Sequence, residues 1–239
     1  MIKTILGFGY LALAMIFLLP FALIALILHG FGLRKSMKMV VYRLAQGWAR
    51  SLIPVAGGKV TVEGREKIPK KGGVCFVSNH GGFYDIIILL AFCGRPFGFV
   101  AKKELLLVPF INIWIYMLGG LFIDRKNVRK AIGTINKGVK RIKAGGGMLI
   151  FPEGHRSQAA GLLPFHAGSL KLATQAEATI VPVAIKGSYD VWEKNKRVVS
   201  APVKITFFDP IETTSVPLED RKQILCDRIY AQIKQELGY

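Results

Sequence analysis

The chain has 239 residues, of which 51% are hydrophobic, and its 33 Lys and Arg residues against 15 Asp and Glu residues give a formal net charge of +18 at pH 7. This length accommodates one α/β domain of ordinary size with a terminal extension. A soluble nucleic-acid-binding protein would share the charge but rarely this apolar composition, whereas an enzyme on an anionic bilayer needs both properties. The composition therefore favours an anionic phospholipid membrane, and no nucleic acid, as the partner.

The N-terminal segment is apolar enough to enter a membrane. Between Lys3 and His29 lie 25 residues with no ionisable side chain except Tyr10. At about 1.5 Å per residue in a helix, they are long enough to cross a hydrocarbon core of roughly 30 Å. Basic residues follow at Arg34, Lys35, Lys38, Arg43 and Arg50. By the positive-inside rule they predict a protein of the inner membrane whose main body lies on the cytoplasmic face.

A second helix is predicted directly after this segment. From Met37 to Leu52 the apolar residues recur at helical spacing, which is typical of an amphipathic helix. Two arrangements are compatible with the sequence. In one, residues 5–28 span the bilayer; in the other, they and residues 36–52 form a hairpin that dips into one leaflet, with Pro20 as a kink. The amphipathic helix favours the hairpin.

The chain is predicted to divide into a membrane anchor, residues 1–54, and a main domain, residues 55–239. After Gly57-Gly58, short β-branched runs alternate with longer helical patterns, which indicates an α/β domain with a mostly parallel central sheet of about seven strands flanked by helices. The expected strands are residues 60–63, 74–78, 97–101, 121–123, 148–151, 180–185 and 203–208. The expected helices are residues 84–93, 104–118, 127–143, 167–176 and 217–237.

Two prolines qualify this prediction. The uncharged stretch Leu105–Ile123 is long enough for a second membrane span, but Pro109 and Gly119-Gly120 interrupt it, so a buried helix followed by a strand is expected. Pro182 lies inside a predicted strand, which indicates an edge strand or a bulge.

The sequence favours neither metal nor nucleotide chemistry, and no bound cofactor is expected. The widely spaced cysteines form no C-x-x-C pair and are interpreted as buried residues or free thiols: Cys75, Cys93 and Cys226. Five residues could be drawn as a metal-ligand set: His80, Asp85, Glu153, His155 and His166. None of these histidines has the i, i+4 spacing of a helical metal pair, and no G-x-x-x-x-G-K-[ST] phosphate loop is present.

The segment Asn79–Asp85 carries the strongest chemical signal. His80 and Asp85, with four residues between them, follow an apolar run and supply a base with its orienting acid. The sequence has no G-x-S-x-G motif, so no hydrolase-type nucleophile accompanies them. The proton that His80 would remove is therefore expected to belong to a substrate.

Further polar clusters follow other predicted strands, where ligand sites of α/β domains collect. Glu153, Gly154 and Arg156 lie in the turn after one strand, and Arg125 ends another. Lys102 and Lys103 end a third. Taken singly, the first cluster is explained equally well as an ordinary turn with a solvated charge pair. For the other two, solvated charge is the commoner explanation.

Taken together and in order, these blocks resemble the glycerolipid acyltransferase family, most closely its 1-acyl-sn-glycerol-3-phosphate acyltransferases. The H-x-x-x-x-D block of that family is matched by His80 and Asp85, its arginine-ending block by residues 121–125, its F-P-E-G block by residues 151–154, and its proline-containing strand by residues 181–183. The resemblance covers residues 36–210. Its four blocks stand in the same order at compatible spacing.

The resemblance implies direct transfer of a fatty acyl group from a thioester to a lysolipid hydroxyl, giving phosphatidic acid in phospholipid biosynthesis. His80 would act as general base and Asp85 would hold its ring. By similarity, Lys102 or Lys103, Arg125 and Arg156 would surround the acceptor phosphate. Glu153 would bind an acceptor hydroxyl or fix Arg156, and Gly154 would allow close backbone approach. An apolar tunnel for the acyl chain is expected along residues 86–92 and 105–117.

Several alternatives stay open at this point. His155 and His166 stand where the family usually has threonine and lysine, which leaves room for another lysolipid acceptor, such as an acylated amino acid or a different lysophospholipid. The positive charge suits an acidic acyl carrier protein as donor, but it would also attract the phosphates of acyl-coenzyme A. Other classes are a non-catalytic lipid-binding protein and a lipid hydrolase that uses Ser78 or Ser157.

Overall fold

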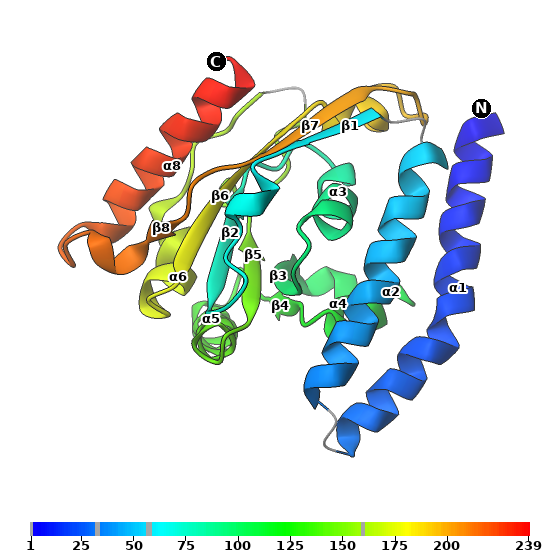
Figure 1. Ribbon diagram of the computed structural model, residues 1–239, viewed down its shortest axis with the longest axis horizontal. Helices are drawn as coiled ribbons and strands as arrows, with labels where there is room; N and C mark the ends of the chain where they lie inside the picture. The colour runs from blue at the N-terminus through cyan, green and yellow to red at the C-terminus, as the bar shows by residue number, and fades with distance from the viewer. Residues whose placement is uncertain (1, 32–33, 56–58, 159–160) are drawn as a thin grey trace.

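A computed structural model describes residues 2–31, 34–55, 59–158 and 161–239 of the chain. A central sheet carries helices on both faces, and two long N-terminal helices stand beside it (Figure 1). The strand order is β1-β7-β6-β2-β5-β3-β4, and β8 pairs with β6 outside this path. The strands are β1 (Lys59–Glu63), β2 (Val74–Ser78), β3 (Phe97–Lys102), β4 (Leu121–Ile123), β5 (Gly147–Ile150), β6 (Thr179–Lys186), β7 (Pro202–Phe207) and β8 (Ile211–Glu212).

The predicted mostly parallel α/β sheet is confirmed. β4, β3, β5, β2 and β6 are parallel neighbours, and β1 is parallel to β7. Among the described strands, only the pairings of β6 with β7 and β8 are antiparallel. All seven expected strands are present, and the eighth, β8, is two residues long, too short for its alternation of side chains to mark it in the sequence.

Pro182 does not mark an edge strand or a bulge, contrary to the expectation. Its strand, β6, lies inside the sheet between β2 and the two antiparallel partners. β8 pairs with β6 at residues 179–180 and β7 pairs with it at residues 183–186, so Pro182 falls where one partner ends and the next begins. The missing N–H of proline therefore interrupts no antiparallel ladder, and its carbonyl still accepts from Phe208 N at 3.0 Å.

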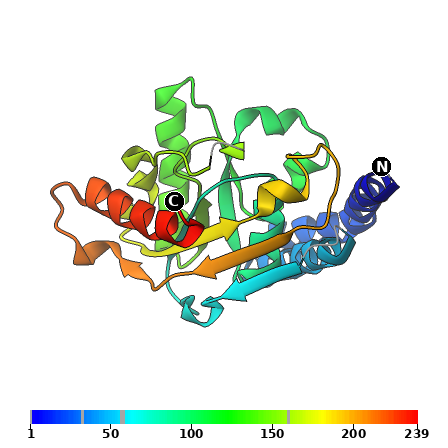
Figure 2. The same cartoon turned by 90° about the horizontal axis from the view of Figure 1, so that it is seen from above.

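Helices of the main domain cover the two faces of the sheet with separate apolar clusters. One cluster contains residues of α3 (Tyr84–Phe92), and the other contains residues of α5 (Val128–Lys143), α6 (Lys171–Gln175) and α8 (Arg221–Leu237). Viewed from above, α8 and the N-terminal helices lie at opposite ends of the molecule (Figure 2). The cysteines Cys75, Cys93 and Cys226 are buried free thiols, as expected.

Two of the expected helices are divided in the structure. Residues 104–118 form a 3-10 helix, η2 (Lys103–Leu107), followed by α4 (Ile111–Met117), because Pro109 separates them. Residues 167–176 form a 3-10 helix, η4 (Ala167–Leu170), that runs into α6. A short helix that was not expected, α7 (Ser188–Val191), follows β6.

The N-terminal segment forms two helices, α1 (Ile2–Gly30) and α2 (Arg34–Val55), which run antiparallel side by side (Figure 1). α1 bends partway along its length and contains Pro20. Its residues Thr4–Phe21 form a segment long and apolar enough to cross a membrane, and none of the side chains described in this segment is buried. α2 packs instead on α3, where Tyr42 and Ala49 join the core. The expected boundary glycines, Gly57-Gly58, lie outside the described residues.

Candidate active site

The segment that carries His80 leaves the end of β2 and is tied to β6. The side chain of Asn79 donates from Nδ2 to the carbonyl of Ile185 and accepts from Ile185 N through Oδ1, both at 2.8 Å. Asn79 is buried, so this pair of bonds replaces the ladder bonds that β2 loses as it ends. His80 therefore begins from a fixed point of the sheet.

His80 and Asp85 form a short hydrogen bond. His80 Nδ1 lies 2.7 Å from Asp85 Oδ2, and the carboxylate is fully buried in the first turn of α3. The same oxygen accepts from Gly82 N at 2.9 Å. An ionised carboxylate only accepts, so Nδ1 carries the hydrogen and Nε2 is left as the basic nitrogen. The positive end of α3 further stabilises the carboxylate.

The imidazole is held on its face and its backbone as well. The ring of Phe151 stacks on the His80 ring, with centroids 4.0 Å apart and planes inclined by 15°. Ser157 N donates to the His80 carbonyl at 2.8 Å. The loop after β5 thus fixes the position that β2 and α3 define.

Glu153 binds two backbone amides beside His80. It is fully buried; Oε1 accepts from His80 N at 2.5 Å and Oε2 accepts from Leu163 N at 3.0 Å. Burial raises its pKa to about 7 from an ordinary 4.5, against the lowering effect of these two backbone bonds. Among the described residues, Arg156 pairs with Glu193 rather than with Glu153. Each oxygen of Glu153 has room for a second hydrogen bond, so binding of an acceptor hydroxyl by Glu153 stays a prediction. Glu153 supports the loop that carries His80.

The cations predicted to hold a phosphate have different surroundings, and Arg125 lies against Gly154. Arg125 donates from Nη1 to the carbonyl of Gly154, and a Cβ atom added to Gly154 would lie 3.7 Å from the His166 ring. Gly154 has φ +78°, a conformation that favours glycine. Arg125, which follows β4, and His166 are therefore both neighbours of Gly154 in the loop after β5.

The two lysines at the end of β3 lie in different environments. Lys103 pairs with Asp124 at 2.8 Å, which raises the pKa of the lysine and lowers that of the carboxyl. Lys102 is exposed. Of the two expected alternatives, Lys102 is thus the less engaged cation.

Arg156 has a partner that the sequence did not reveal. Its Nη1 lies 3.4 Å from Glu193 Oε1, and its guanidinium carbon lies 3.8 Å above the Phe83 ring. Glu193 belongs to the segment after α7, more than thirty residues along the chain, and no motif surrounds it. Only the fold of this segment over the start of α3 brings the carboxylate here.

Both serines considered as nucleophiles are engaged by backbone carbonyls. Ser78 Oγ donates to the carbonyl of Asn79 at 3.0 Å, and Ser157 Oγ to that of His80 at 3.3 Å. Both residues are buried. The hydroxyls therefore face the main chain rather than the imidazole that would have to activate them.

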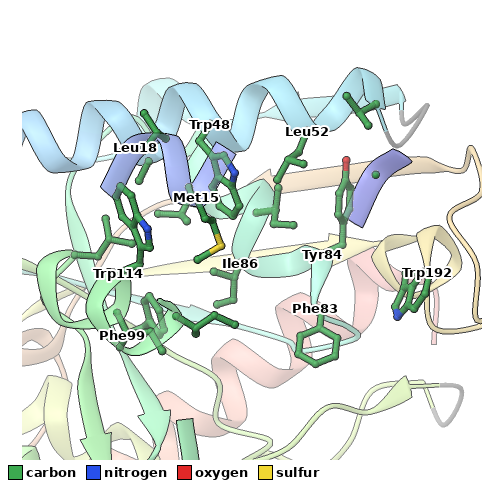
Figure 3. A pocket seen from close by; sticks show the side chains of 18 of the residues that line it. Met15, Leu18, Trp48, Leu52, Phe83, Tyr84, Ile86, Phe99, Trp114 and Trp192 are labelled. Carbon is green, nitrogen blue, oxygen red and sulfur yellow. The ribbon is translucent and has the colours of Figure 1, made fainter. Parts of the chain in front are cut away.

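An apolar cavity of about 500 Å³ lies between the N-terminal helices and the main domain (Figure 3). Four parts of the chain line it: α1 with Met15 and Leu18, α2 with Trp48 and Leu52, α3 with Ile86 and Leu90, and the α4 region with Leu105 and Trp114. Phe83 and Tyr84, which stand between His80 and Asp85 in the chain, complete one end of it. The two segments expected to border an apolar tunnel do line this cavity, which reaches the start of α3.

Comparisons with known proteins agree with this arrangement. A family model described as acyltransferase matches residues 59–186. The 1-acyl-sn-glycerol-3-phosphate acyltransferase of Escherichia coli is 31% identical over 78% of this chain and 77% of that protein. The protein of the same name from Borreliella burgdorferi is 35% identical over 59% of this chain, which spans 56% of the Borreliella protein. The coconut (Cocos nucifera) protein of that name is 32% identical, and the chain spans 53% of it.

A solved structure shares the fold along the whole chain. The crystal structure of the 1-acyl-sn-glycerophosphate acyltransferase PlsC from Thermotoga maritima superposes with a TM-score of 0.83 and covers 100% of this chain and 96% of the Thermotoga chain. The two sequences are 23% identical. The sheet and the N-terminal helix pair are thus features of a known architecture.

Proposed function

Because the chain belongs to the acyltransferase family, we propose that it transfers a fatty acyl group from a thioester to the sn-2 hydroxyl of 1-acylglycerol-3-phosphate, giving phosphatidic acid. The observation that carries the proposal is the 2.7 Å bond between His80 and Asp85, two residues joined by a turn whose Phe83 and Tyr84 line an apolar cavity. The names of its relatives give the same reaction class. Its product is a precursor of membrane phospholipids.

The chemistry follows from the two nitrogens of His80. Nε2 takes the proton of the acceptor hydroxyl as the oxygen attacks the thioester carbonyl, and Asp85 stabilises the imidazolium through Nδ1. The carbon–sulfur bond then breaks, the proton passes to the departing thiolate, and the products are an ester and a free thiol. The acyl group passes directly to the acceptor, with no acyl-enzyme. Apolar walls such as Trp114 and Leu90 would receive the acyl chain.

The acceptor phosphate is assigned to the cations near Gly154. Arg156 follows this residue two positions later, and Arg125 donates to its carbonyl. The planar guanidinium bonds phosphate oxygens in pairs. Lys102 is the third candidate. His166, beside Gly154, stands where the family usually has lysine, and this observation supports a second candidate acceptor, a lysolipid with another headgroup.

The membrane and the acyl donor would meet different faces of the protein. α1 exposes Leu13, Phe17 and Ile24 among other large apolar side chains, which supports insertion into the cytoplasmic leaflet of an anionic inner membrane. α5 lies on the opposite face of the sheet from α2 and α3. From Arg125 to Phe151 there are eight basic residues, Arg125 included, and no acidic one. This surface supports an acidic acyl carrier protein as donor, with acyl-coenzyme A as the alternative.

The test is a panel of purified reactions. Wild-type protein in mixed micelles is incubated with several lysolipids and with both donor types, and the product masses are followed. Turnover of lysophosphatidic acid that disappears in the His80→Ala variant, while that variant still binds vesicles, supports the proposal. Preference for another lysolipid would move the assignment to the second acceptor. Full turnover by His80→Ala would refute the mechanism.

A further inference from the structure

Glu193 reaches the turn between His80 and Asp85 from a distant part of the chain. Its Oε1 accepts a hydrogen bond of 2.6 Å from Phe83 N, at the start of α3. The side chain is only 10% exposed. A carboxylate at this position is favoured by the free N–H groups and the positive end of the helix.

The turn is shaped to admit this carboxylate. A Cβ atom added to Gly82 would lie 2.7 to 2.9 Å from the three carboxylate atoms of Glu193. Such distances exclude any side chain at position 82 while Glu193 stays in place. The absence of a side chain at position 82 therefore leaves room for the Glu193 carboxylate.

The same carboxylate oxygen holds Arg156. The Nη1 to Oε1 distance is 3.4 Å, and the guanidinium rests on the Phe83 ring, which is itself 60% exposed. Glu193 engages one nitrogen of a group that carries five N–H donors, so several remain for another anion. Arg156 is thus held at one edge, over an exposed ring, beside the His80 turn.

We propose that Glu193 is a positioning residue for the acceptor: it sets Arg156 over Phe83 so that the guanidinium meets the anionic headgroup of the lysolipid. This inference rests on the proposed acyl transfer to a lysolipid. Glu193 touches neither reacting atom. It acts through Arg156 and through the Phe83 amide.

Two physical effects of removing the charge of Glu193 have opposite signs, which makes the proposal testable. If Glu193 acted only through its field, Glu193→Gln would remove a negative charge next to an anion and tighten acceptor binding. If Glu193 positions Arg156, the same change frees the guanidinium and weakens acceptor binding. Glutamine keeps an oxygen for Phe83 N and nearly the same shape against Gly82.

The experiment measures kcat and KM separately for lysophosphatidic acid and for the acyl donor. We expect Glu193→Gln to raise the acceptor KM about tenfold, within the range of coupling between contacting residues, and to leave kcat and the donor KM within about twofold. In an Arg156→Met background, Glu193→Gln should add no further change in KM. Glu193→Asp, which keeps the charge but shortens the reach, should also raise the acceptor KM and serves if the glutamine variant fails to fold.

The matched control is Glu236→Gln on α8, which removes a carboxylate that is bonded to Thr206 and paired with Lys204 instead of with an arginine of the site. Its acceptor KM should be that of the wild type. An unchanged or lower acceptor KM in Glu193→Gln, additive effects in the double variant, or a fall in kcat without a change in KM would overturn the proposal. Failure of the proposed function is distinguishable, because wild-type protein would then transfer no acyl group to any lysolipid.

Discussion

Replacement of Asp85 by asparagine separates the charge of this residue from its geometry. Oδ2 of Asp85 accepts from both His80 Nδ1 and Gly82 N, while Oδ1 is buried with no hydrogen-bond partner among the described residues. The backbone N–H of Gly82 cannot rotate, so the amide oxygen of asparagine must take the Oδ2 position. It then still accepts from Nδ1, and the imidazole keeps its tautomer.

What Asp85→Asn loses is the interaction of a full negative charge with the imidazolium. Two unit charges about 4 Å apart attract by about 4 kcal/mol at an effective dielectric constant of about 20, which is an upper bound here because the amide dipole retains part. A charged hydrogen bond exceeds a neutral one by about 1 to 1.5 kcal/mol, which sets a lower bound. A loss of about 1 to 4 kcal/mol corresponds to a fall in kcat/KM of about fivefold to 1000-fold.

The assay is release of free thiol from an acyl thioester at saturating acceptor, with the thermal midpoint of each variant as the check on folding. Asp85→Ala is the reference, because it removes the charge, the hydrogen bond to His80 and the partner of Gly82 N together. We expect at least tenfold more activity in the asparagine variant than in the alanine variant. Equal activities would refute the reasoning, since they would mean that the Gly82 amide does not orient the side chain.

Three further predictions concern burial, charge and volume. The raised pKa of Glu153 means that folding favours its protonated form. The contribution of Glu153 to the free energy of unfolding is therefore largest below pH 4.5 and falls by about 3 kcal/mol as the pH rises to about 7. We expect the thermal midpoint of Glu153→Gln, relative to that of the wild type, to rise between pH 4.5 and pH 8. Charge reversal of three exposed α5 residues, Lys137, Lys140 and Lys143, should raise KM about tenfold for an acyl carrier protein donor and leave KM for acyl-coenzyme A nearly unchanged. Ala45→Phe, which fills part of the cavity, should lower kcat/KM about fourfold for each methylene that no longer enters, because burial of one methylene contributes about 0.8 kcal/mol.

Each of these has an internal comparison. For the stability prediction, a pH-independent difference between the two proteins would contradict the raised pKa. For the docking prediction, reversal of Lys222, Arg228 and Lys234 on α8 removes the same charge elsewhere, and equal loss with both donors or loss of vesicle binding in the α5 variant would argue against a protein-docking surface. For the cavity, the shortest donors should react at the wild-type rate, and a uniform loss at all chain lengths would point to misfolding.

The sheet was predictable because its strands are short apolar runs with clear ends. All seven expected strands form, and β2 and β5 are buried along their whole lengths, which is the pattern of central parallel strands. The position of β6 was not predictable from Pro182, because tolerance of a missing N–H depends on which strands lie alongside. Along β6, the pairing strand changes from β8 to β7 near Pro182, and this change exists only in the folded sheet.

The centre of the site was predictable and its supports were not. His80 and Asp85 stand five positions apart, so one turn between a strand and a helix suffices to join them. Glu153 was predicted as a site residue and lies beside His80, but the backbone amides that it binds carry no sequence signal. Glu193 was missed for the same reason: its contact with Arg156 spans 37 residues and exists only once α7 has folded over α3.

The cavity wall formed by α1 and α2 would combine two functions, membrane attachment and selection of the acyl chain. Met15 and Trp48, which belong to the segment expected to hold the protein in the bilayer, are also surfaces against which the hydrocarbon chain would be measured. A truncation made to free the domain from lipid would therefore also remove this wall of the cavity. The truncated protein should lose its discrimination between acyl-chain lengths before it loses acyl transfer. Substitutions that adapt the anchor to a thicker or thinner bilayer would likewise alter which fatty acids are chosen.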